Sequence, residues 1–304
     1  MIPYLLFYKI LQLSVVMVLG FLLVKTGILK SDDSKALSKI SIYLLIPAVI
    51  INAFDMEITA EIMQGLLLGV IASVLIHIIF LIMGKFYRQF FHGTDVEIAS
   101  IIYSNAGNLI VPIVLFVLGE EWLIYSCSYM SVQIIYFWTH GIRLFSAEKF
   151  QFKKILLNTN ILAIFVGVLL MVTGFRLPVF VKDITSSLGS MVGNFGMLIA
   201  GMLAAEVDFK GMLRNKRMYL VLIMRLIVFP LAVFTGMKAV LPYLQVPHAD
   251  KVLLISFLAC STPAAATIMQ MAKIHDKDAD FAVAVNIVTT IACIITMPVF
   301  VALF

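Results

Sequence analysis

Long apolar stretches dominate the chain, and short runs of polar and charged residues separate them. A helix needs roughly 20 mostly apolar residues to cross the hydrocarbon core of a bilayer. Ten stretches come near that length, at about residues 5–25, 36–54, 60–83, 97–118, 122–143, 154–173, 184–205, 217–240, 251–272 and 279–303. These stretches are too continuous for the alternating pattern of β-barrel strands, each roughly 10 residues long. The pattern predicts an all-α polytopic membrane protein with ten transmembrane helices.

The composition strengthens this prediction and excludes several function classes. The chain is 62% hydrophobic and 13% charged, whereas a soluble domain is about half apolar and about a quarter charged. The short connections leave no room for a soluble catalytic or nucleotide-binding domain, and no GxxxxGK[ST] phosphate loop occurs. The net charge of +5 reflects basic residues at a membrane surface, so we expect no nucleic-acid partner.

The residues give no indication of an enzyme or a metal site. Cys127, Cys260 and Cys293 lie in apolar stretches without metal-ligand spacing. No HExxH motif and no acidic pair occurs within the apolar stretches. We therefore expect no enzymatic activity, no cofactor and no bound metal.

The distribution of basic residues predicts the orientation. Sixteen of the 22 lysine and arginine residues fall in the loops after the odd-numbered stretches, and five fall on the other side. Cytoplasmic loops carry an excess of lysine and arginine. This places the odd-numbered loops in the cytoplasm and both termini outside.

Two stretches, the fourth and the ninth, carry a proline and small polar residues near the middle. The fourth reads YSNAGNLIVP over residues 103–112, and the ninth reads CSTPAAA over residues 260–266. A proline inside a helix removes a backbone donor, and the freed groups need partners within the membrane. Each stretch is the fourth of five in its half of the chain, and such paired interruptions are typical of a secondary transporter's binding site. We expect a 5+5 inverted repeat, with residues 1–148 as the first repeat and residues 149–304 as the second.

The interrupted stretches supply the candidate substrate site. A half-helix that begins near a break presents free N–H groups and a positive dipole end, which suits an anion such as a carboxylate. The predicted substrate-binding residues are Ser104, Asn105, Gly107, Asn108, Pro112, Ser261, Thr262, Pro263 and Ala264.

Four further polar residues lie inside apolar stretches. Gln133 and Asn286 occupy corresponding helices of the two halves, and either line the site or form hydrogen bonds between helices. His77 is a candidate proton acceptor or a packing residue. Arg225 either extends to the cytoplasmic surface or pairs with a substrate carboxylate or a neighbouring acid.

The motifs, in order and spacing, resemble those of the auxin efflux carrier family, which includes bacterial relatives of the plant pin-formed auxin transporters. The second stretch, with Leu37-Ser38-Lys39 and then YLLIPA at residues 43–48, is similar to the family's LSK…YLLLPA pattern. The fourth resembles its N-x-G-N-x-G-x-P pattern, with Ile110 where glycine is frequent. The ninth resembles its A-x-x-P-x-A pattern, with Cys260 at the first alanine.

The resemblance implies more than the residues themselves show. It implies that helices 4 and 9 are broken and cross. It implies a scaffold of helices 1, 2, 6 and 7, a transport domain of helices 3–5 and 8–10, and an elevator mechanism. It also implies organic-anion substrates, such as malate or malonate, and a bacterial inner (cytoplasmic) membrane.

Together these observations predict a secondary active transporter or uniporter of small organic anions, embedded in a lipid bilayer. The coupling ion, H⁺ or Na⁺ if there is one, stays open. A GxxxG spacing at Gly189 and Gly193 is compatible with a homodimer. The alternatives are a sodium-coupled organic-anion symporter of the bile-acid transporter type, in which uptake would need sodium, and a membrane sensor.

Overall fold

The structure is a computed structural model that describes residues 2–146, 156–208, 211 and 214–304, and most of these residues are helical. No strand occurs among them. The expected boundary between the two halves, at residues 148 and 149, lies outside the described residues.

The helices of the first half follow the predicted stretches in order. They are α1 (Ile2–Lys25), α2 (Ser34–Ile40), α3 (Ile46–Ala53), α4 (Ala60–Phe91), α5 (Asp95–Ile102), α6 (Ala106–Val117), α7 (Leu123–Tyr136) and α8 (Ile142–Phe145). A π-helical turn, Ser41–Leu45, joins α2 to α3, and another, Phe137–Gly141, joins α7 to α8.

The second half continues in the same way. Its helices are α10 (Thr159–Thr173), α11 (Val179–Ser190), α12 (Val192–Ala204), α14 (Lys216–Ile223), α15 (Phe229–Val240), α16 (Ala249–Ser261), α17 (Ala266–Ile274) and α18 (Ala279–Leu303). A π-helical turn, Met224–Val228, joins α14 to α15, and it ends two residues before Pro230.

Six helical segments of the described chain are long and apolar enough to cross a membrane. They are Ile2–Lys25, Ser31–Ala53, Ala60–Phe91, Val179–Ala204, Lys216–Tyr243 and Ala279–Leu303. These spans show a multi-pass membrane protein, and the full set of ten helices in two repeats stays a prediction.

Helix α4 shows how the side chains are sorted in such a fold. Its buried face carries small residues, among them Gly65, Gly69 and Ala72, whereas its exposed face carries large apolar ones such as Leu67 and Leu75. Because lipid tails are as apolar as leucine, large apolar side chains are stable on the outside, and small ones allow helices to pack closely.

Glycines bring α1 and α12 into close contact. A Cβ atom at Gly201 would collide with the backbone of Met17, and one at Gly20 would collide with the backbone of Leu198. The two helices therefore pack backbone to backbone, which fixes one side of the fold.

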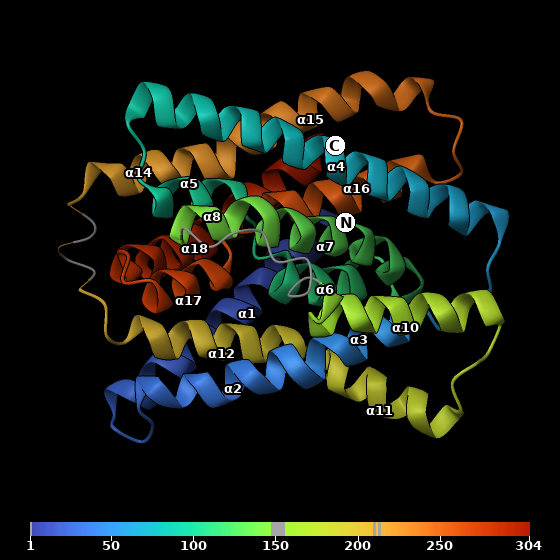
Figure 1. The fold of residues 1–304 in the computed structure, drawn as a ribbon, viewed down its shortest axis with the longest axis horizontal. Helices are drawn as coiled ribbons and strands as arrows, with labels where there is room; N and C mark the ends of the chain where they lie inside the picture. Colours follow the sequence, from blue (N-terminus) through green and yellow to red (C-terminus); the bar gives the residue numbers. More distant parts are fainter. Residues whose placement is uncertain (1, 147–155, 209–210, 212–213) are drawn as a thin grey trace.

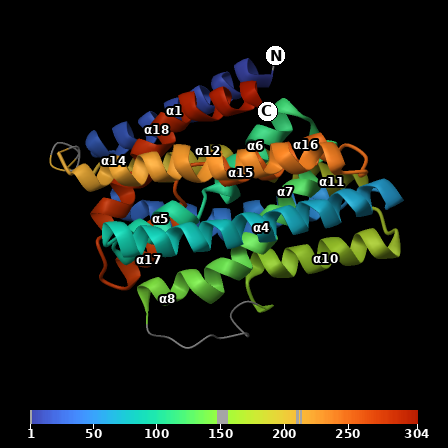
Figure 2. The same ribbon diagram turned by 90° about the horizontal axis from the view of Figure 1, so that it is seen from above.

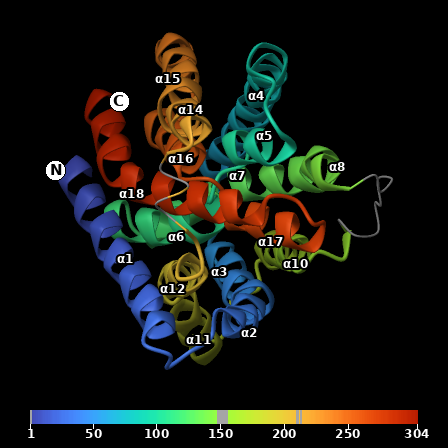
Figure 3. The same ribbon diagram turned by 90° about the vertical axis from the view of Figure 1, so that its left-hand side faces the viewer.

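The interrupted helices lie in the middle of the molecule. Helices α2, α3, α11 and α12 lie on one side of them and α4, α14 and α15 on the other, as the side and end views show (Figures 1 and 3). Helices α5 and α17 lie toward one end, and α6 and α16 toward the other (Figures 1 and 2). The chain thus changes from one half-helix to the next at the centre of the fold.

Candidate binding site at the crossing of two helical interruptions

Two short non-helical segments cross at the centre. Helix α5 ends at Ile102 and α6 begins at Ala106, while α16 ends at Ser261 and α17 begins at Ala266. The segments pair as a single antiparallel bridge between Ser104 and Ala264.

Two backbone hydrogen bonds hold the bridge. The N–H of Asn105 donates to the carbonyl of Pro263 at 2.8 Å, and the N–H of Ala265 donates to the carbonyl of Tyr103 at 3.0 Å. Each segment thereby gives the other a partner for backbone groups that would otherwise be left unpaired inside a membrane.

The prolines behave differently in the two segments. Pro263 lies within the interruption between α16 and α17, as the sequence predicts. Pro112, in contrast, lies inside α6, and the chain leaves helical geometry at residues 103–105 instead. There Ser104 and Asn105 are residue types whose short polar side chains favour turns and helix ends over helix interiors.

The side chain of Gln133, from α7, satisfies both backbone groups of Ser104. Its Oε1 accepts from the Ser104 N–H at 3.1 Å and from the Ser104 hydroxyl at 2.6 Å, while its Nε2 donates to the Ser104 carbonyl at 2.9 Å. A glutamine side chain here substitutes for a neighbouring strand.

Two side chains of α18 do the same for Ala264. The Asn286 Nδ2 donates to the Ala264 carbonyl at 2.5 Å, and the Thr289 Oγ1 accepts from the Ala264 N–H at 3.2 Å. Thus Gln133 and Asn286, which the sequence places in corresponding helices, support the two halves of one bridge.

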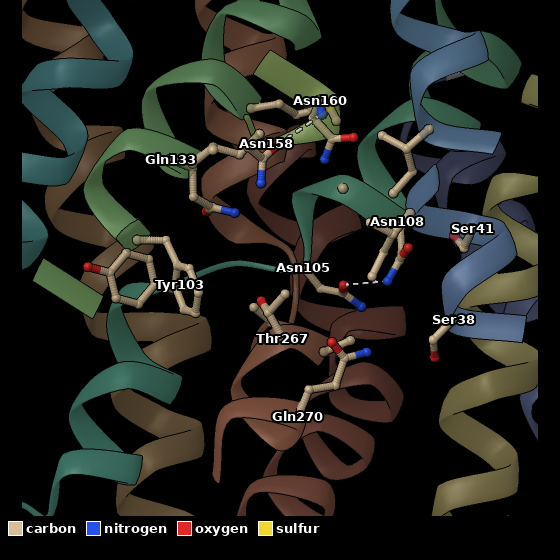
Figure 4. Close-up of a pocket in the computed structure, with 18 of the residues that line it drawn as sticks. Ser38, Ser41, Tyr103, Asn105, Asn108, Gln133, Asn158, Asn160, Thr267 and Gln270 are labelled. Carbon is tan, nitrogen blue, oxygen red and sulfur yellow. Dashed lines mark hydrogen bonds between the residues drawn. The ribbon is translucent and has the colours of Figure 1, made fainter. Parts of the chain in front are cut away.

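A cavity of about 590 Å³ opens beside the crossing. Among the described residues that line it, none is acidic, basic or histidine. Its polar lining consists of amides, hydroxyls and backbone at the start of α6, α10 and α17 (Figure 4). The labelled polar lining residues are Ser38, Ser41, Tyr103, Asn105, Asn108, Gln133, Asn158, Asn160, Thr267 and Gln270.

Asn105 and Asn108 form the polar edge of the cavity at the start of α6. The Asn108 Nδ2 donates to the Asn105 Oδ1 at 3.1 Å (Figure 4). The Asn105 Nδ2 has no such bond among those of the described residues, so it remains available as a donor. Gly196 of α12 lies against Asn108, where a Cβ atom would come within 2.8 Å of its side chain.

The cavity gathers part of the set that the sequence predicts. Ser104, Asn105, Gly107, Asn108 and Gln133 line it. The remaining predicted residues lie at or behind the crossing without lining it, and they are Pro112, Ser261, Thr262, Pro263, Ala264 and Asn286.

The sequence did not lead us to several residues that line the cavity. Ser38 and Ser41 lie three residues apart on the second predicted helix, and Thr267 and Gln270 lie three apart on α17. That spacing places two side chains on one helix face, and it is the signal that could have found them. Asn158 caps α10, and its Oδ1 accepts from the Asn160 N–H at 3.0 Å.

Arg225 is fully buried, so the first of its two predicted roles, extension to the cytoplasmic surface, is wrong. Its guanidinium donates only to backbone carbonyls, at the ends of α5 and α16. No acid pairs with it among the ion pairs of the described residues.

His77 is also fully buried, in α4. Its ring stacks on Tyr136 with centroids 5.1 Å apart, and its Nδ1 lies 2.7 Å from the Ser73 carbonyl. The Nδ1 therefore carries the proton, while Nε2 has no partner among the described residues. His77 does not line the cavity.

The described residues contain no group of three or more histidine, cysteine or acidic side chains arranged to hold a metal ion.

Comparison with known families gives a match over nearly the whole chain. The matching family model describes a membrane transport protein, and it covers residues 5–155 and 146–301.

The chain belongs to the membrane transport protein family, which is the auxin efflux carrier family. The protein is thus a membrane transporter, as the resemblance of its motifs implied. No curated protein matches the chain. The cavity and the crossing segments of this transporter lie within the matched residues.

Proposed function

We propose that the protein is a secondary active transporter or uniporter of small organic anions. One observation carries the proposal: α6 and α17 both begin at a single cavity that amide side chains line. The proposed substrates are carboxylates such as malate or malonate, or auxin-like acids.

The electrostatics of the cavity suit an anion. The N-terminus of a helix carries about half a positive charge, and its first N–H groups have no partner within the helix. Two such ends meet at the cavity, so a carboxylate placed there gains favourable dipoles and several donors. Asn105, Asn108 and Gln270 add side-chain amides to those donors.

The described residues that line the cavity carry no charge, which also supports a transporter rather than a tight binder. An anion held by dipoles and amides leaves no uncompensated charge behind when it departs, whereas a lining arginine would hold it strongly. A carrier must release its substrate on the far side, so moderate binding is favourable.

The mechanism that we propose is elevator-type alternating access. Helices 3–5 and 8–10 (α4–α8 and α14–α18) form the transport domain, and helices 1, 2, 6 and 7 (α1–α3 and α10–α12) form the scaffold. The glycine of α12 that packs against Asn108, Gly196, gives the scaffold a smooth surface beside the site. Two family matches, one in each half, support an inverted 5+5 repeat.

We further propose a multi-pass protein of the bacterial inner (cytoplasmic) membrane with both termini outside. The excess of lysine and arginine in the odd-numbered loops supports this orientation. A homodimer is compatible with this arrangement.

The test is uptake of a labelled carboxylate panel into proteoliposomes under an imposed membrane potential. Wild type is compared with Asn105→Ala and with Asn194→Ala, since Asn194 is an exposed asparagine of α12 that does not line the cavity. We expect one or more anions to enter with wild type and Asn194→Ala. We expect uptake with Asn105→Ala to fall at least tenfold, which corresponds to about 1.4 kcal/mol. Equal uptake by all three proteins would place the site elsewhere, and uptake of no anion would overturn the proposal.

A further inference from the structure

The helix ends that carry negative partial charge at the crossing bind the side chain of Arg225. The last carbonyl groups of a helix have no donor within the helix and carry about half a negative charge. Helices α5 and α16 both end at the crossing. Their terminal carbonyls converge on the guanidinium of Arg225, which extends from the π-helical turn between α14 and α15.

Every nitrogen of the guanidinium is used. The Nε donates to the Thr262 carbonyl at 3.1 Å, and one terminal nitrogen donates to Thr262 at 2.7 Å and to Cys260 at 2.8 Å. The other terminal nitrogen donates to the carbonyls of Ile101 at 2.9 Å and Ile102 at 3.4 Å. Four carbonyl groups from two different helices thus surround one planar cation.

The charge of Arg225 is balanced by helix ends rather than by an acid. Two helix C-termini, at about half a negative charge each, together offset one guanidinium. The groups near Arg225 on neighbouring elements are neutral or aromatic: His77 and Phe80 of α4, Tyr129 of α7, Cys260 of α16 and Cys293 of α18. The Phe80 ring centre lies 5.8 Å from the guanidinium carbon.

A cluster of carbonyl oxygens at the ends of broken helices is also the usual site of a coupling cation in secondary transporters. Sodium and other hard cations take oxygen ligands of this kind. Here the same oxygens are already occupied, by a cation that is covalently attached to the chain.

We propose that Arg225 fills a cation site formed by the carbonyls of Ile101, Ile102, Cys260 and Thr262, and so replaces a dissociable coupling cation. This inference rests on the proposed function, and deepens it by assigning the coupling: anion transport needs no sodium. The permanent charge holds α5 and α16 together and keeps the opposite, positive ends of α6 and α17 free for the substrate. Arg225 is a positioning residue in this scheme, since it does not line the cavity.

The first experiment opens the site and offers it a free cation. Arg225→Ala removes the guanidinium and leaves the carbonyls in place. The thermal unfolding of the purified variant is measured in choline chloride, and then with about 10 mM guanidinium, sodium or potassium added at constant ionic strength. We expect the substitution to lower Tm by roughly 5–10 °C, and guanidinium or sodium to restore at least half of that loss.

Met218→Ala is the matched control. Met218 is fully buried in the same helical run, and its side chain has no hydrogen-bond donor to offer the carbonyl cluster. Its truncation should lower Tm without any response to the added cations. Wild type should show no response either, because its site is filled. A response of Met218→Ala equal to that of Arg225→Ala, or no response of Arg225→Ala, would overturn the proposal.

Wild type provides a second test that holds even when Arg225→Ala fails to fold. Its Tm in sodium chloride should equal its Tm in choline chloride, and anion uptake should not change when an inward sodium gradient is imposed. Sodium-stimulated uptake, or stabilisation of wild type by sodium, would contradict the inference. The unfolding measurements need no anion, so they test the cation site even when the anion panel shows no uptake.

Discussion

Two short segments cross at the centre: the first is residues 103–105 and the second is residues 262–265. Their backbone groups are paired in the same way, but their surroundings differ. Ser104 and Ala264 are bridge partners, and side chains from corresponding helices satisfy the N–H and the carbonyl of each. Gln133, which supports Ser104, also lines the cavity, whereas Asn286 and Thr289, which support Ala264, are fully buried.

This difference indicates that the two segments have different roles. The first segment exposes its support to the cavity and continues into Asn105 and Asn108, so it offers donors to a substrate. The second segment is enclosed by α18, and the residues that follow it contribute mainly the start of α17. Changes to the first segment should therefore affect transport, and changes to the second should affect stability.

Gln133→Glu gives the largest expected effect. The substitution preserves the shape of the side chain but adds a negative charge to a cavity whose described lining residues carry none. Two negative charges about 6 Å apart repel by roughly 3 kcal/mol at an effective dielectric constant of about 20. Uptake of the transported anion should fall by about 100-fold in proteoliposomes.

Two other variants isolate the role of charge at this position. Gln133→Ala loses the bonds to Ser104 without adding charge, so its uptake should lie between wild type and Gln133→Glu. Gln64→Glu places the same charge on an exposed position of α4 and should leave uptake unchanged. Equal uptake by wild type and Gln133→Glu would show that no anion binds near Gln133.

Asn286→Ala should have the next largest effect, and on stability. It leaves the buried carbonyl of Ala264 without its donor, and an unsatisfied buried polar group costs about 1–3 kcal/mol. Urea unfolding in detergent micelles should show that loss, and it should exceed the loss for Gln133→Ala, because water in the cavity can reach Ser104 after that substitution. A larger loss for Gln133→Ala would reverse the proposed division between the segments.

Local patterns in the sequence predict part of this arrangement. The apolar stretches and the paired polar interruptions are local patterns, so the sequence alone indicates the apolar spans and the two interrupted stretches, whereas the crossing of those stretches was implied only by the family resemblance. Asn105, Asn108 and Gln133 could be predicted because a polar residue in an apolar stretch stands out.

The remaining features depend on contacts between distant segments. The interruption at residues 103–105 depends on hydrogen bonds with Pro263, Ala265 and Gln133. The sequence suggested instead that Pro112 interrupts the helix, but Pro112 lies inside α6. The partners of Arg225 are backbone carbonyls more than 30 residues away in sequence. Every residue has a backbone carbonyl, so the sequence does not indicate which carbonyls accept hydrogen bonds from Arg225.

Thr289→Val should have the smallest effect and is the most selective test of the second segment. The Thr289 Oγ1 accepts from the Ala264 N–H, so valine leaves that donor unpaired, at a cost of about 1 kcal/mol. Thr290→Val is the matched control, because the Thr290 hydroxyl donates only to the Asn286 carbonyl within its own helix. Urea unfolding should show a loss for Thr289→Val and nearly none for Thr290→Val, while uptake by both stays near that of wild type. A loss of uptake in Thr289→Val without a loss of stability would mean that the second segment also takes part in binding, and the comparison between the segments would have to be abandoned.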